Sequence, residues 1–89
     1  MDDREMEKQL RDALKRLGIA VRVETLEEGV GGLCRLEQDR LVVLSHDLPR
    51  SKRIEILLNA LRRLDTAGIY LPPAIRDRLE EDPDVPHTT

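Results

Sequence analysis

The sequence is poor in aromatic residues and in long apolar runs. Its 89 residues contain a single aromatic side chain, Tyr70, and neither phenylalanine nor tryptophan. A hydrophobic core must therefore be aliphatic, and the chain lacks the aromatic platforms on which unpaired nucleic-acid bases stack. Its longest apolar runs are far shorter than the roughly 20 residues that a membrane-spanning helix needs. We therefore expect a domain with no membrane span.

Cysteine is also scarce. The single cysteine, Cys34, excludes an internal disulfide and a cysteine metal cluster, so a reducing compartment is the simplest setting. The first ten residues, MDDREMEKQL, are charged from the second position and do not have the pattern of a signal peptide. These two features predict a cytoplasmic location.

No excess of positive charge is present. The formal net charge is −3, and the charged residues, 37% of the chain, are interspersed as on a solvated surface. Basic residues do gather near the predicted second helix, but acidic residues are interleaved with them: Arg50, Lys52, Arg53, Arg62 and Arg63 against Asp47, Glu55 and Asp65. Nucleic acid is therefore a disfavoured partner.

An amphipathic helix is predicted over residues 3 to 17. Apolar residues recur at spacings of three and four, at Met6, Leu10, Ala13, Leu14 and Leu17. Charged residues fill the opposite side, at Glu7, Lys8, Arg11, Asp12 and Lys15. Acidic residues near the start and basic residues near the end suit the helix dipole, and Gly18 supplies a left-handed stop.

After Gly18 the apolar period changes to two. Ile19, Val21 and Val23 alternate with exposed positions and predict a half-buried strand. Beyond the glycine-rich residues 27–32, the runs LCRL (33–36) and LVVLS (41–45) predict a hairpin. The second run is apolar on both faces, so we expect a central strand covered on both sides. The predicted sheet has three strands and is mainly antiparallel.

Two further helices are expected. The second spans residues 49 to 66, with Asp47 or Ser51 as its cap and Gly68 as its end. Its apolar stripe is formed by Ile54, Leu57, Leu58, Leu61 and Leu64. The second helix is expected to pack on the sheet, and Pro73 then opens a short third helix that buries Ile75 and Leu79. The fold class is thus α+β, with one domain over residues 1–80 and a polar, disordered tail over residues 81–89.

Cys34, His46 and Asp65 are the candidate pocket residues. His46 beside Asp47 could be a general base oriented by a carboxylate, although adjacent residues at a strand end point in opposite directions. Cys34 could be a nucleophile or a small buried residue. Asp65 lies at the edge of the apolar stripe and needs a partner, either Arg62 or a turn amide. An enzyme would require all three to converge on one pocket.

The order of helix, LGI-VRV strand, glycine turn, hairpin and Arg-led helix resembles the N-terminal part of the ImmA/IrrE-type zinc peptidases. In that family the helix after the sheet reads roughly R-F-T-L-A-H-E-x-x-H. Aligning Arg53-Ile54 with R-F implies that Leu58 and Arg62 stand at the zinc-binding histidines and Asn59 at the catalytic glutamate. These side chains neither bind zinc nor activate its water. The chain is also similar to a small uncharacterised bacterial family with a GGLCRL…LPP signature.

Two functions from different classes remain open. The first is a non-catalytic protein-interaction or scaffold domain, with no cofactor or metal, which binds a protein partner or a second copy. Its surface would be the exposed side of the sheet or the third helix, with Leu71, Ile75 and Leu79 as candidate anchors. The second is a small enzyme or ligand-binding protein with a pocket near Cys34, His46 and Asp65. The positions of these residues in the fold distinguish the two.

Overall fold

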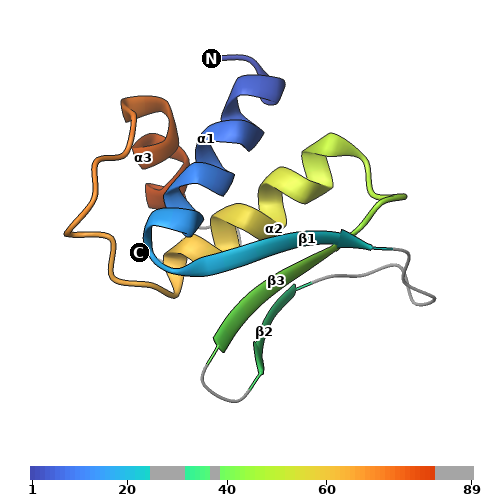
Figure 1. Cartoon of the computed structure of the whole chain (residues 1–89). Coiled ribbons are helices and arrows are strands. Elements are labelled where there is room, and N and C mark those ends of the chain that lie inside the picture. The colour runs from blue at the N-terminus through green and yellow to red at the C-terminus, as the bar shows by residue number, and fades with distance from the viewer. Residues whose placement is uncertain (25–31, 37–38, 82–89) are drawn as a thin grey trace, which may run out of the picture.

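A computed structural model describes residues 1–24, 32–36 and 39–81; within 32–36 and at residue 39 it describes the backbone alone. Its elements follow the order α1 (Asp3–Arg16), β1 (Ile19–Glu24), β2 (Gly32–Leu36), β3 (Asp39–Ser45), α2 (Arg50–Arg62) and α3 (Pro73–Glu80). The α+β class is therefore confirmed (Figure 1). The predicted tail lies outside the described residues, except for Glu81. None of the described helices is both long and apolar enough to span a membrane.

Helix α1 forms as its sequence predicts. The Asp2 carboxylate caps the first turn by accepting the Glu5 N–H at 2.8 Å. Gly18 follows the helix with φ +82°, in the left-handed region that glycine adopts without strain. The predicted apolar face is buried at Met6, Leu10, Ala13 and Leu14. The helix therefore packs against the rest of the chain along its length.

The sheet is mixed, with strand order β1-β3-β2. β2 and β3 pair antiparallel, whereas β1 and β3 pair parallel, so the prediction of a mainly antiparallel sheet is wrong for the second pair. A hairpin sets the direction of β2 against β3. β1 lies on the other side of β3, where no short turn sets its direction.

The central position predicted for β3 is confirmed. Val42 and Leu44 are fully buried in one cluster with apolar residues of α1 and α2. These two helices lie over one face of the sheet (Figure 1). We expected β3 to be covered on both faces of the sheet. The described helices lie on one side of the sheet only, so they cover one face of β3. On the other face Leu41 is still buried and Val43 is half-buried.

Helix α2 is shorter than predicted and begins differently. Its N-cap is Pro49, with no side-chain hydrogen bond, and neither Asp47 nor Ser51 acts as the cap. The Pro49 carbonyl accepts the N–H groups of Lys52 and Arg53. At the other end the Arg63 and Leu64 N–H groups bond three residues back, which tightens the last turn and ends the helix at Arg62, ahead of Gly68.

One hydrophobic core unites the described elements. It is formed by apolar residues of α1, β1, β3, α2 and the segment containing α3: Met6, Leu10, Ala13, Leu14, Ile19, Val42, Leu44, Ile54, Leu57, Leu58, Ala60, Leu61, Leu71 and Ile75. This core holds α1 against α2. It therefore also sets the positions of the polar side chains where the two helices meet.

Candidate functional site

A buried carboxylate, Glu7 of α1, lies within reach of three arginine side chains. Glu7 is 7% exposed. Arg53 of α2 donates two hydrogen bonds to the Glu7 carboxylate, from Nε to Oε2 at 3.0 Å and from Nη2 to Oε1 at 3.2 Å. Arg11, one turn further along α1, donates Nη2 to Oε2 at 2.6 Å. Arg50 places its Nε 3.6 Å from Oε1. We call Glu7, Arg11, Arg50 and Arg53 the arginine cluster.

The cluster also fixes the entry into α2. Arg53 donates Nη1 to the Leu48 carbonyl at 2.8 Å, so one guanidinium binds both α1 and the segment before α2. Arg50 and Arg53 are three residues apart in the first turn of α2 and therefore face the same way. Because this turn lacks acidic residues and a side-chain cap, the positive end of the helix dipole adds to the positive charge there.

The surroundings of Glu7 change its ionisation. Burial removes water from the carboxylate and by itself raises the pKa of Glu7, but the hydrogen bonds and charges of Arg53 and Arg11 outweigh that effect and lower the pKa below its usual value. Glu7 is therefore an ionised structural anion at neutral pH. A carboxylate held in this state is a poor proton donor.

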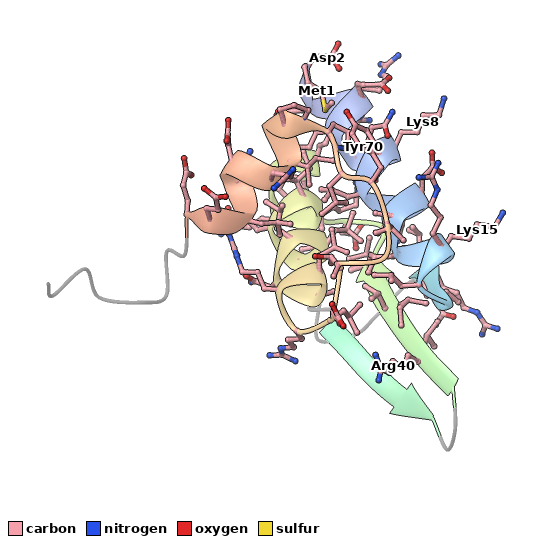
Figure 2. The ribbon with its side chains drawn as sticks, turned by 90° about the vertical axis from the view of Figure 1, so that its left-hand side faces the viewer. Met1, Asp2, Lys8, Lys15, Arg40 and Tyr70 are labelled. Carbon is pink, nitrogen blue, oxygen red and sulfur yellow. The ribbon has the colours of Figure 1, made fainter. Side chains whose placement is uncertain are left out.

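The arginine cluster forms the floor of a surface depression of about 460 Å³ between α1 and α2. Three exposed residues of α1 complete its lining: Arg4, Lys8 and Asp12. Figure 2 shows Lys8 projecting from α1 into solvent. Cationic residues outnumber acidic ones five to two around the depression. We call these seven residues the basic face.

Several cationic groups of the basic face have unused hydrogen-bonding capacity. Arg4 and Lys8 make no hydrogen bond or ion pair with the described residues. The Nε of Arg11 is buried without a hydrogen-bond partner among them. Guanidinium groups bind carboxylates and phosphates through paired N–H donors, so the basic face suits an anionic group. The lining residues are all charged, five cationic and two acidic.

The structure places His46 and Asp65 at opposite ends of α2. A helix of 13 residues is about 20 Å long, which is too far for one hydrogen-bond network. The His46 side chain is 54% exposed, with Nε2 3.4 Å from Oδ1 of its neighbour Asp47. Asp65 is exposed and accepts the Ala67 N–H at 3.0 Å, the turn amide that the sequence suggested as its partner. The side chain of Cys34 lies outside the described residues.

The three candidate anchors belong to the core of this chain. Leu71 and Ile75 are 6% and 0% exposed, and Leu79 is partly buried against the same cluster. α3 needs these side chains to pack on α2, so they do not form an exposed interaction surface. The neighbouring Tyr70, labelled in Figure 2, is 70% exposed. The sequence around Tyr70 has no apolar periodicity that would mark it as a candidate surface residue.

The residues aligned with the zinc-peptidase motif hold α2 to α3. Leu58 is buried, and the Asn59 Oδ1 accepts Nη1 of Arg62 at 2.6 Å. Arg62 then donates Nη2 to the Arg78 carbonyl at 2.7 Å and Nε to the Leu79 carbonyl at 3.2 Å. Its Nη2 also contacts the Glu81 carbonyl. The described residues contain no group of three or more His, Cys, Asp or Glu side chains placed to hold a metal.

Sequence reasoning placed Glu7 on the solvent side of α1 and so missed the centre of the basic face. The available signal was the spacing of charges. Glu7 and Arg11 are four residues apart, and Arg50 and Arg53 form a second basic pair at the start of α2. Their convergence depends on the packing of α1 on α2, which the periodicity of neither helix reveals.

Comparison with protein-family models, curated proteins and solved structures gave no match for this chain. The function is therefore argued from the geometry of the basic face.

Proposed function

We propose that this chain is a non-catalytic protein-interaction domain whose basic face binds an acidic segment of a partner protein. The observation that supports this proposal is the depression between α1 and α2, where five cationic residues surround two acidic ones and Arg4 and Lys8 have no described partner. In a chain with a net charge of −3, this local excess of positive charge stands out from the rest of the surface.

The floor of the basic face is ordered before any ligand arrives. Glu7 holds Arg53 and Arg11 in fixed orientations, so these side chains lose little conformational entropy when a second carboxylate approaches. Arg50 is held more loosely, 3.6 Å from Glu7, and keeps its terminal amino groups for a ligand. Arg4 and Lys8 at the exposed rim would then steer an acidic segment toward this floor.

The shape of the basic face favours a short protein segment over nucleic acid. The cationic residues surround one depression of about 460 Å³ and do not form a long stripe. Asp12 belongs to the same lining, and would repel a continuous phosphate backbone more than it would repel spaced carboxylates. The one aromatic side chain, Tyr70, lies in the segment between α2 and α3 and is not among the lining residues.

The resemblance to the zinc peptidases is compatible with this proposal. In a metal-free relative of that fold, the aligned positions are free to take structural roles, as Leu58, Asn59 and Arg62 do here. An interaction role for the remaining scaffold requires no chemistry at those positions.

A binding experiment with a matched control tests the proposal. The probe is a short fluorescein-labelled poly-glutamate peptide, followed by fluorescence anisotropy. We expect Arg4→Glu/Lys8→Glu to weaken binding about tenfold or more, because two rim charges change sign. The control, Arg63→Glu/Arg76→Glu, changes two exposed residues outside the depression by the same net charge and should have a much smaller effect.

Two results would overturn the proposal. Equal weakening by both double variants would show that net charge alone attracts the peptide. Tighter binding of a labelled duplex DNA of similar length, with the same loss in Arg4→Glu/Lys8→Glu, would assign the basic face to nucleic acid. We expect peptide affinity to fall with added salt, since the rim contacts are exposed to solvent.

A further inference from the structure

β1 is an outer strand of the sheet, and no described strand lies along its outer edge. β1 lies at one end of the strand order and, within the described residues, pairs with β3 alone (Figure 1). Its sequence, IAVRVE, contains neither the proline nor the lysine that commonly blocks an edge strand. Val23 is 43% exposed there. An edge of this kind can accept a further strand.

The hydrogen-bonding groups that face this edge can be assigned. In a strand paired in parallel on one side, the N–H and C=O groups of alternate residues point toward that side and those between them point away. The Glu24 carbonyl accepts the His46 N–H at 3.0 Å, so Glu24, Arg22 and Ala20 turn toward β3. The backbone groups of Ile19, Val21 and Val23 therefore point to the open edge.

The side chains of β1 carry a pattern that is complementary to itself. Arg22 and Glu24 are two residues apart, so both are on the sheet face opposite the helices, and both are exposed. Two copies of β1 that meet antiparallel about a two-fold axis at Val23 bring Arg22 of each copy opposite Glu24 of the other. Parallel pairing of the two strands has no such two-fold axis and does not bring both Arg22–Glu24 pairs together.

We propose that this protein forms a homodimer by antiparallel pairing of β1 with β1 of a second copy, with Val23 at the two-fold axis. The exposed side chain of Val23 is then covered by Val23 of the second copy. The outward N–H and C=O groups of Val23 form hydrogen bonds with the C=O and N–H groups of Val23 in the second copy. Arg22 and Glu24 form a pair in which the side chains lie closest, because their own backbone groups bond β3. The two sheets become one continuous sheet.

Charge reversal with rescue tests this arrangement on the full chain. Sedimentation equilibrium over a concentration series should show a monomer–dimer equilibrium. Arg22→Glu places like charges opposite each other twice per dimer, and we expect the dimer Kd to rise about tenfold or more. Glu24→Arg should act in the same way. The double variant Arg22→Glu/Glu24→Arg restores both pairs and should return the Kd to within about threefold of the original.

Matched controls make the result decisive. Arg40→Glu changes an exposed residue of the central strand by the same charge and should leave the Kd unchanged. Val23→Lys places a charge at the axis and should abolish the dimer, while circular dichroism verifies that each variant remains folded. A monomer at the highest concentration accessible to NMR would overturn the proposal. A dimer whose Kd the single reversals leave unchanged, or the double variant fails to restore, would overturn it as well.

Discussion

Glu7 is the residue on which most of the charged contacts of α1 and α2 depend. Its carboxylate receives Arg11 from its own helix and Arg53 from α2, while Arg50 lies 3.6 Å away. Neutralising it leaves these arginines without their anion. We expect Glu7→Gln to lower the free energy of unfolding at neutral pH by about 1–3 kcal/mol, measured by urea denaturation. An unchanged midpoint would contradict this role.

The same residue predicts a dependence of stability on pH. The pKa of Glu7 is lower in the folded protein than its usual value, so its contribution is present above the unfolded pKa and is lost as pH falls through the folded pKa. We expect the free energy of unfolding to decline below about pH 4 more steeply in the original protein than in Glu7→Gln, which lacks the carboxyl group. Parallel declines in the two proteins would assign the acid sensitivity to other carboxylates.

Arg62 performs the corresponding task between α2 and α3. It donates to the Arg78 and Leu79 carbonyls near the end of α3, groups that a helix terminus otherwise leaves unsatisfied. We expect Arg62→Ala to destabilise the protein by about 1–3 kcal/mol in chemical denaturation. Arg62→Lys should recover only part of the loss, because lysine lacks the planar fork. The neighbouring exposed residue provides the control: Arg63→Ala should stay close to the original stability.

At the scale of elements, the link between α1 and β1 depends on one backbone conformation. Gly18 has φ +82°, and a Cβ built there would meet no atom within 4 Å, so any cost of a side chain comes from the backbone. We expect Gly18→Ala to destabilise the protein by about 1 kcal/mol in thermal or chemical unfolding. Gly68, which has equal space and no positive φ, is the matched control, and Gly68→Ala should be close to neutral or stabilising. Equal effects at the two positions would contradict this account.

The elements also show which features a sequence pattern can predict. Helix α1 has a regular apolar stripe, an acidic start and Gly18 after its last turn, so its bounds were predictable from local signals. The end of α2 was not, because its apolar stripe continues to Leu64 while the backbone tightens at Arg63. The parallel pairing of β1 was missed because the alternation of Ile19, Val21 and Val23 is the same in either direction.

The candidate site was less predictable than the fold. Cys34, His46 and Asp65 stood out because their side chains have chemical reactivity, yet α2 separates the second from the third. The residues that do converge, Glu7 with Arg11 and Arg53, are ordinary surface types when each helix is considered alone. These charged side chains form a site only because α1 packs against α2.

Across the whole molecule, two separate surfaces suit two kinds of partner. The basic face between α1 and α2 would receive an acidic segment, and the edge of β1 would receive a second copy of the chain. The dimer tests described above bear on the second surface alone, so either assignment can fail without the other.

Binding of an acidic segment to the basic face can be mapped residue by residue by NMR. Unlabelled poly-glutamate peptide would be titrated into nitrogen-15-labelled protein, with the amide spectrum recorded at each step. We expect saturable shifts at the amides of Arg4, Lys8, Arg11 and Arg50, and little change in α3. Shifts confined to other elements, or no shifts at low salt, would contradict it.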